Sequence, residues 1–387
     1  MDPQNDSSRI DQAYRLLALC ARAEGHPAFY EQLANQLRAF TAWDELPTQA
    51  ELHGMAPLLW HHISKSGIAI PEVTQRILRG LYLRHRLHNQ IHSRVLTEII
   101  ALLQKSGIQP LVLKGLALAS QYYPDSALRP CSDIDLLLKQ SDFLPALKLL
   151  VNAGYNLRLP PPSRRLPKSV SGFSSARDGV SVQVELHHYD PKGRHEKGYS
   201  PDPEFKDLDT HPQTVLINGN IIYAPAHTEM LHYLMRHITK HLFVGHAGNP
   251  AQIKWMADII SLVEHHAKEM DWTHLRRYRP DILNRLELFY SYTPLPEHLT
   301  QIIPIKQVAP PSGFNQYPPG WPHQSIKQWK QVGLLRFIWQ IIIPPSDWWI
   351  RLYYGLGEGS LFWHRYIVYR AQVLSSIFWV LMHRMDL

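Results

Sequence analysis

The segment 111–139 constrains the fold of this chain most, because it holds two strand-like apolar runs and the second opens with a pair of aspartates. In a β-strand, the side chains of residues i and i+2 point to the same face of the sheet. Asp133 and Asp135 are therefore expected to stand side by side. Two adjacent carboxylates repel each other unless a positive charge lies between them, and a hard divalent cation such as Mg²⁺ suits such a pair. The spacing predicts a divalent-cation site at this strand.

Helices are predicted on both sides of this segment, because apolar residues recur there at steps of three and four. The clearest helix covers 72–106, and Gly107 is placed to end it. Its outer positions are basic and rich in histidine, which fits either a solvated face or a face that meets a polyanion. Further helices are predicted at 9–40 with a break near Gly25, and at 43–63, 230–242, 251–267 and 271–295.

The central region is predicted to combine strands and helices. Ser141 and Asp142 are expected to cap a helix that runs to Ala153. Polar and apolar residues alternate along 180–188, which places Glu185 and His187 on one face of a strand. Other strands are predicted at 111–113, 134–138, 155–159 and 172–177, with a hairpin at 215–223 that turns at Asn218 and Gly219. This order indicates an α/β or an α+β core.

Five regions follow from these patterns. They are an N-terminal helical region (1–106), the core with the Asp-x-Asp strand (107–223), a helical substrate or acceptor region (224–303), a Pro-rich hinge (304–324) and an aromatic, basic helical tail (325–387). The proline-rich segments 159–169 and 191–214 are predicted to be loops. Tryptophans and tyrosines at helical spacing in the tail are typical of packing on a core, and docking on an anionic membrane surface is the alternative.

Composition narrows the class of protein. A hydrophobic fraction of 45% with 19% charged residues is ordinary for a globular protein of 387 residues. Its two cysteines, Cys20 and Cys131, suggest neither a disulfide framework nor a CxxC metal site, so a cytoplasmic protein is expected. We expect no signal peptide and no membrane-spanning helix, because the first residues are polar and apolar runs are short. The net charge of +7 suits a nucleotide, a nucleic acid or an anionic membrane surface alike.

A second histidine-containing pattern lies in the predicted helix 230–242. His237 and His241 are four residues apart and therefore share a face. A metal site there needs a further ligand such as Asp258, and a structural role is the alternative interpretation. Cys131 is interpreted as a small buried residue.

The motifs LVLKG, YYPD and LRPCSDIDLLL, followed by QVELH and later by PAHTEMLHYLMRH and KWMADI, resemble a family of largely uncharacterised bacterial nucleotidyltransferase-like proteins. That family lies in the polymerase-beta-like nucleotidyltransferase superfamily, and the resemblance covers roughly residues 50–290. It implies an α+β fold in which a small polymerase-beta-type nucleotidyltransferase core, a mixed β-sheet with flanking helices, is embedded between N- and C-terminal helical regions.

The resemblance also implies a set of site residues. Asp133 and Asp135 would bridge two divalent ions, Mg²⁺ or Mn²⁺, and Glu185 would be the third ligand. One ion would lower the pKa of an attacking hydroxyl, and the other would bind the triphosphate and the leaving pyrophosphate. The implied nucleotide-binding residues are Lys114, Gly115 and Arg129: the glycine for close backbone approach to phosphate, and the two cations for phosphate charge.

Each of these residues also has a structural interpretation. Asp133 and Asp135 can cap a turn at the end of a strand, and Glu185 can be an exposed strand residue. Lys114 can pair with one of these carboxylates, and Arg129 can anchor its own loop through a salt bridge. For His187 a supporting role is expected in place of a catalytic one.

The sequence therefore supports two hypotheses. The first is an enzyme that moves a nucleoside monophosphate from a nucleoside triphosphate (NTP) to a hydroxyl or amine of a small molecule, a sugar, a peptide or protein, or an RNA end. The second is a catalytically inactive binding or scaffold protein, with the tail making weak contact with a membrane surface. Gly115-Leu116, in place of the superfamily's Gly-Ser or Gly-Gly, favours the second, and the three carboxylates favour the first.

Overall fold

The structure is a computed structural model, and it describes residues 3–157, 169–174, 176, 179–189, 212–242, 252–306, 308, 333, 342, 347–357 and 361–384. Five helices come first: α1 (Pro3–Leu19), α2 (Pro27–Ala39), α3 (Leu46–Leu52), α4 (Ala56–Ser66) and α5 (Glu72–Lys105). The central part contains β1 (Leu111–Val112), α6 (Leu116–Tyr122), η1 (Ser126–Leu128), β2 (Asp133–Lys139), α7 (Gln140–Asn152), β3 (Asn156–Leu157), β4 (Ser169–Phe173), β5 (Gln183–Tyr189), β6 (Gln213–Ile217) and β7 (Asn220–Ala224).

Helices resume after the sheet. They are α8 (His227–Leu242), α9 (Ile253–His266), α10 (Trp272–Tyr278), α11 (Pro280–Tyr290), η3 (Glu297–Leu299), α14 (Asp347–Tyr354), α15 (Leu361–Trp363), the π-helical segment η5 (His364–Val368) and α16 (Tyr369–Arg384). Within the described residues, none of these helices combines the length and the apolar character needed to cross a membrane. Most of the predicted hinge 304–324 lies outside the described residues, as do the loop 159–168 and most of the loop 191–214.

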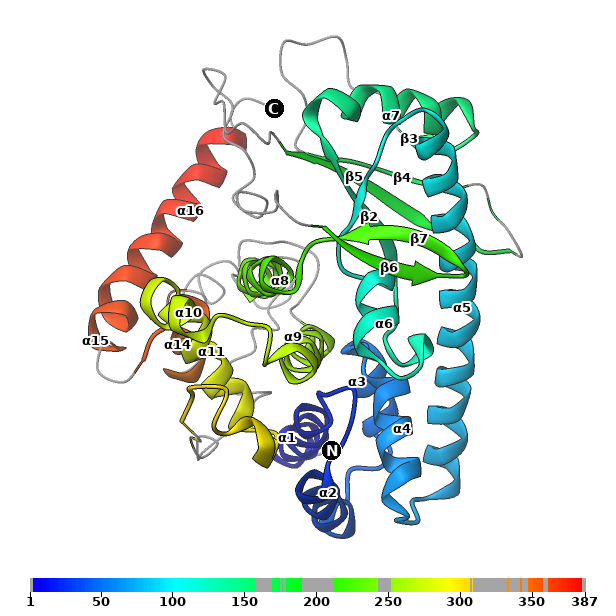
Figure 1. The fold of residues 1–387 in the computed structure, drawn as a ribbon. Coiled ribbons are helices and arrows are strands. Elements are labelled where there is room, and N and C mark those ends of the chain that lie inside the picture. The colour runs from blue at the N-terminus through cyan, green and yellow to red at the C-terminus, as the bar shows by residue number, and fades with distance from the viewer. Residues whose placement is uncertain are drawn as a thin grey trace.

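The strands form one mixed sheet of seven, in the order β3-β4-β5-β2-β1-β7-β6 (Figure 1). β2 lies near the centre, parallel to β5 and antiparallel to β1, and β1 is parallel to β7. The α+β fold, with a mixed sheet and flanking helices, is therefore confirmed. The hairpin of β6 and β7 turns at Asn218 and Gly219, both with positive φ, as the Asn-Gly pair predicts.

One face of the sheet is apolar because alternate residues of the central strands are aliphatic. Ile134, Leu136 and Leu138 of β2 are buried on this face, where α5 and α7 cover the sheet (Figure 1). Burial of each such side chain contributes about 2 kcal/mol. The same alternation turns the odd-numbered residues of β2 to the opposite face, so one strand both anchors the core and presents its aspartates.

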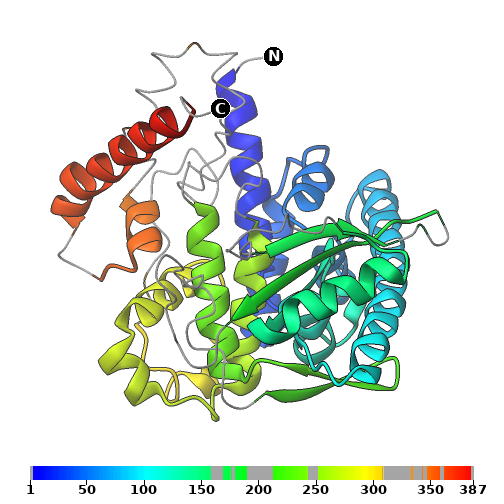
Figure 2. The ribbon, with the colours of Figure 1, turned by 90° about the horizontal axis from the view of Figure 1, so that it is seen from above.

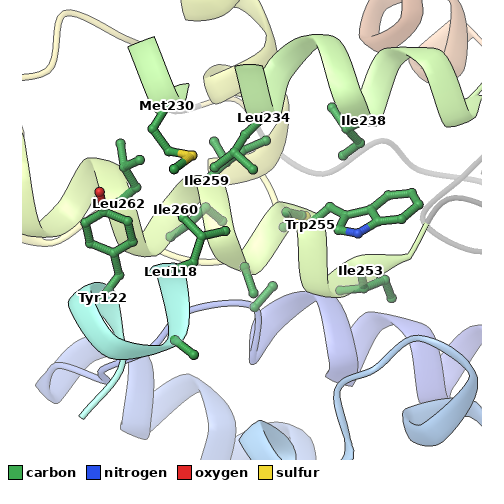
Figure 3. Close-up of a cluster of buried hydrophobic side chains, with 14 of the residues drawn as sticks. Leu118, Tyr122, Met230, Leu234, Ile238, Ile253, Trp255, Ile259, Ile260 and Leu262 are labelled. Atoms are coloured by element: carbon green, nitrogen blue, oxygen red, sulfur yellow. The ribbon is translucent and has the colours of Figure 1, made fainter. Parts of the chain in front are cut away.

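Helices α8 and α9 stand between the sheet and the C-terminal helices α14 and α16, as two views agree (Figures 1 and 2). Their contact is apolar: Figure 3 shows Met230 and Leu234 of α8 facing Ile259 of α9. Part of the predicted tail also belongs to this core, because Trp348 and Trp349 of α14 are buried.

Three element predictions are wrong. Residues 43–63 form two helices, because the chain turns at Gly54 with φ +64°. The predicted helix 271–295 is interrupted before Pro280, which has no N–H to continue the first helix and starts α11 instead. Helix α7 begins at Gln140 with Lys139 as its N-cap, so Ser141 and Asp142 lie inside the first turn and do not cap it. By contrast, Gly107 ends α5 with φ +73°, as predicted.

Candidate active site

The register of two parallel strands assembles the acidic residues. In the pairing of β2 with β5, Asp135 lies opposite Glu185, and His187 lies two residues further along β5, opposite Leu137. Paired residues in adjacent strands point to the same face, so Asp133, Asp135, Glu185 and His187 line the face that α5 and α7 leave open. The sequence predicted each strand's alternation, and the register that joins them comes from the structure.

Three of these side chains converge on one point. His187 Nε2 lies 3.3 Å from Asp135 Oδ1 and 3.9 Å from Glu185 Oε2. One ligand atom from each of the three residues lies within 4.8 Å of the others, which is close enough to share a cation. Ser169 on β4 donates a hydrogen bond of 2.8 Å to Glu185 Oε1 and holds that carboxylate in place. The trio thus offers two oxygen donors and one nitrogen donor.

Asp135 is the most buried member, with 4% of its surface exposed. Burial alone would raise the pKa of Asp135, but Lys114 and His187 outweigh it, and the pKa falls to about 2. The carboxylate is therefore ionised at neutral pH. Its Oδ2 is paired with the ammonium of Lys114, whose Nζ lies 3.3 Å away. A divalent cation is another positive charge that would suit this buried carboxylate.

Lys114 stands between the two aspartates. Its Nζ is 3.3 Å from Asp133 Oδ2 and 3.3 Å from Asp135 Oδ2. Burial would lower the pKa of Lys114, but both carboxylates raise it, so the side chain stays charged. This is the pairing with carboxylate given above as the alternative for Lys114. The Lys114 ammonium supplies the positive charge that Asp133 and Asp135 require. A contact between Lys114 and a nucleotide stays a prediction.

Gly115 lies at the turn between β1 and α6. Its φ of +61° is a conformation that side-chain-bearing residues rarely adopt, and an added Cβ would stand 3.5 Å from the carbonyl oxygen of Asp133. The glycine therefore brings the turn close to the acidic strand. Its contact with phosphate stays a prediction.

Arg129 is placed differently from the other predicted residues. Its Nε and Nη2 donate to the two carboxylate oxygens of Asp258, at 2.9 and 2.8 Å, and both side chains are buried. Tyr123 also donates to Asp258 Oδ1, at 2.8 Å. The structure thus has the loop-anchoring salt bridge given as the alternative for Arg129, and its nucleotide contact stays a prediction. Asp258, engaged in this way, is not brought together with His237 and His241 as a metal group.

Two further side chains are influenced by the charges of the site: Lys254, which the sequence analysis did not consider, and His237, which it considered as a metal ligand with His241. Lys254 lies in the first turn of α9, and burial and the charge of Arg129 lower its pKa to about 8, while Asp133 acts in the opposite direction. His237 on α8 is buried, and burial and the nearby Lys114 lower its pKa. A signal for Lys254 was present in KWMADI, because residues four apart on a helix share a face and Lys254 precedes Asp258 by four.

Another group of side chains lies where α8 begins and α9 ends. His227, His266 and Glu269 also have ligand atoms within 4.8 Å of one another. The two imidazole rings are stacked, with centroids 3.4 Å apart and planes 16° apart. A metal lies near the plane of the imidazole that binds it, so two parallel rings at this distance cannot both aim at one ion. We therefore interpret His227 and His266 as a stacked pair with a structural role. A hydrogen bond of 2.9 Å between Tyr122 and His227 fixes one of the two rings.

Comparisons with known proteins show the family to which the chain is similar. The family model described as "Uncharacterised nucleotidyltransferase" matches residues 41–292, which include every residue of the site. A solved structure, of an antigenic nucleotidyltransferase-like protein from Paracoccidioides brasiliensis, is similar at 16% sequence identity and a TM-score of 0.29. That match covers 52% of this chain and 89% of the other. The comparison with curated proteins finds no match.

Proposed function

This chain belongs to the family of uncharacterised nucleotidyltransferases, and from that premise we propose that it transfers a nucleoside monophosphate from an NTP to a hydroxyl or amine acceptor. The reaction is proposed to depend on a divalent cation, Mg²⁺ or Mn²⁺. The acceptor classes are a small molecule, a sugar, a peptide or protein, and an RNA end. We also propose that the enzyme is bacterial and works in the cytoplasm.

The observation that carries this proposal is the convergence of Asp135, Glu185 and His187, whose ligand atoms lie within 4.8 Å of one another. Two of these residues are carboxylates, and Asp133, two residues before Asp135 on β2, lies outside this group of three. Carboxylates suit Mg²⁺ and Mn²⁺, and a nitrogen donor suits Mn²⁺ better than Mg²⁺. The residues present therefore fit a divalent cation held by Asp135 and Glu185, and we propose that Asp133 completes the set of carboxylate ligands. When bound, such cations would neutralise triphosphate charge and activate an attacking hydroxyl.

The chain's own residues prepare this site in two ways. Ser169 and His187 orient the carboxylates of Glu185 and Asp135, so little rearrangement is needed for an ion to enter. Lys114 is a mobile cation on a long side chain that can leave the carboxylates and turn to a phosphate as a divalent ion takes its place. We propose this exchange as the way in which Lys114 contacts the nucleotide.

A transfer assay tests the proposed function. The protein is incubated with each NTP, labelled at the α-phosphate, in the presence of Mg²⁺ or Mn²⁺ and fractionated cell lysate. Label that becomes attached to protein, RNA or a small solute identifies the acceptor class. We expect transfer with the wild type and with Asp142→Asn, which changes a carboxylate outside the site, but not with Asp133→Asn. Equal labelling by the wild type and Asp133→Asn would contradict the proposal.

A second candidate function is a catalytically inactive binding or scaffold protein. One observation favours it: Lys114 already neutralises Asp133 and Asp135, as a structural ion pair would. Its membrane contact would come from the tail, where Phe362, Trp363 and Phe378 are 63%, 64% and 65% exposed. Flotation with anionic vesicles tests that contact, and loss of binding in a Phe362→Ser, Trp363→Ser variant is the result that this candidate predicts.

A further inference from the structure

A positively charged side chain, Lys254, lies on the same face of α9 as Asp258, the partner of Arg129 in the loop before β2. Lys254 is half-buried in the first turn of α9. Within the described part of the chain, no carboxylate lies within ion-pair distance of its Nζ. The neighbouring charges are already matched, since Arg129 is paired with Asp258, and Asp133 with Lys114. A half-buried ammonium without a counter-ion is unfavourable, so an anion that binds next to Lys254 would stabilise it.

The N-terminal helices hold Lys254 in position. Its backbone N–H donates to the carbonyl oxygen of His53, at 3.2 Å. Its aliphatic stem runs over Gly54, where an added Cβ would stand only 2.6 Å from Lys254 Cδ. The turn between α3 and α4 therefore leaves room for the Lys254 stem, because residue 54 has no side chain.

A second polar side chain, His237 of α8, lies against the residue that follows Lys254. His237 is 6% exposed, and its Nε2 has no hydrogen-bond partner. The imidazole packs edge-on against Trp255, the residue after Lys254, with ring centroids 4.8 Å apart. Figure 3 shows Trp255 directly beneath α8. Burial, and after it the positive charge of Lys114, lower the pKa of His237.

We infer that Lys254 and His237 form a phosphate-binding pair, which holds the triphosphate of the donor NTP from the helical side while the carboxylates and their cation hold it from the sheet. This inference rests on the proposed function and names the residues that receive the triphosphate. An ammonium and an imidazole N–H are suitable donors to phosphate oxygens. Arg129, one of the two cations predicted for this task, is occupied by Asp258, whereas Lys254 has no carboxylate partner among the described residues.

The test uses inorganic tripolyphosphate and the four NTPs, because tripolyphosphate reports phosphate binding without depending on the base. Affinities are measured by calorimetry with Mg²⁺ for the full-length wild type, Lys254→Met, Lys254→Arg and His237→Leu. Lys148→Met, which removes an exposed lysine on α7, is the matched control. Thermal unfolding of each variant shows whether it is folded.

We expect Lys254→Met to bind tripolyphosphate and NTP at least about tenfold more weakly, while Lys254→Arg stays within about threefold of the wild type. His237→Leu should weaken binding about fivefold without lowering the unfolding temperature, because it removes a buried polar atom that has no partner. If the wild type binds and the folded Lys254→Met variant binds equally well, the inference is wrong and the proposed function stands. If the wild type binds neither ligand, both are wrong.

Discussion

Replacing Lys114 with methionine is predicted to make the stability of this protein depend on a divalent cation. Methionine retains most of the volume of the side chain but leaves Asp133 and Asp135 without their shared positive charge. The depression of the Asp135 pKa from 3.8 to about 2 corresponds to about 2 kcal/mol of stabilisation of its charged form. Breaking a buried ion pair typically costs about 3–5 kcal/mol, so we expect a loss of about 3 kcal/mol in the free energy of unfolding at neutral pH.

Divalent cations should restore this loss, because an ion can occupy the place that the ammonium leaves. A ligand at about 100 times its dissociation constant stabilises the native state by about 2.7 kcal/mol. Urea denaturation with and without Mg²⁺ measures the effect in Lys114→Met, in the wild type and in the control Lys148→Met. Mg²⁺ should stabilise the wild type less, since Lys114 competes with the ion.

A double variant separates charge from packing. In Lys114→Met, Asp135→Asn the buried charge is removed together with its partner, so stability should recover by at least about 1 kcal/mol, and the response to Mg²⁺ should disappear. The reasoning is refuted if Lys114→Met is as stable as the wild type, or if it is destabilised and Mg²⁺ has no effect on it.

Three further predictions concern the stability of the fold around and beyond the site. Arg129→Met should lower the free energy of unfolding by about 3–5 kcal/mol, because it leaves Asp258 buried and unpaired; a loss under about 1 kcal/mol in urea denaturation would contradict this. Burial lowers the pKa of His62 to about 3, below its unfolded value of 6.5, so the unfolded state takes up a proton first and stability falls as the pH decreases below 6.5. Between pH 7 and pH 5 we expect a loss of about 2 kcal/mol that is absent in His62→Gln, and equal pH profiles for the two proteins would rule it out. Gly172→Ala should destabilise the edge of the sheet by more than about 2 kcal/mol in urea denaturation, since its Cβ would lie 2.1 Å from the carbonyl oxygen of Asn156; unchanged stability would show that β3 can move aside.

The acidic site was accessible to prediction because its chemistry follows from short-range rules. Alternation along a strand sets Asp133 beside Asp135, and the same rule puts Glu185 and His187 on one face of another strand. The structure confirms both strands and adds their parallel pairing. That pairing depends on contacts between residues about fifty positions apart, which no local pattern specifies.

Contacts between residues far apart in the sequence account for the features of the site that the sequence analysis did not predict. Arg129 has the properties of a phosphate-binding residue when it is considered alone, and only the fold shows that its Nε and Nη2 donate to Asp258. For Lys254 the sequence offers only its four-residue spacing from Asp258. Its contact with the turn at Gly54, two hundred positions earlier, comes from the fold alone.

The most direct test of the central claim is a calorimetric titration of NTP and Mg²⁺ into the wild type and Asp135→Asn, with Asp142→Asn as the matched control. We expect the wild type and the control to bind at least one NTP in a manner that requires the cation, and Asp135→Asn to lose this binding by at least about tenfold while remaining folded. NTP binding that is independent of the cation, or that is the same in Asp135→Asn, would contradict a cation site at these carboxylates.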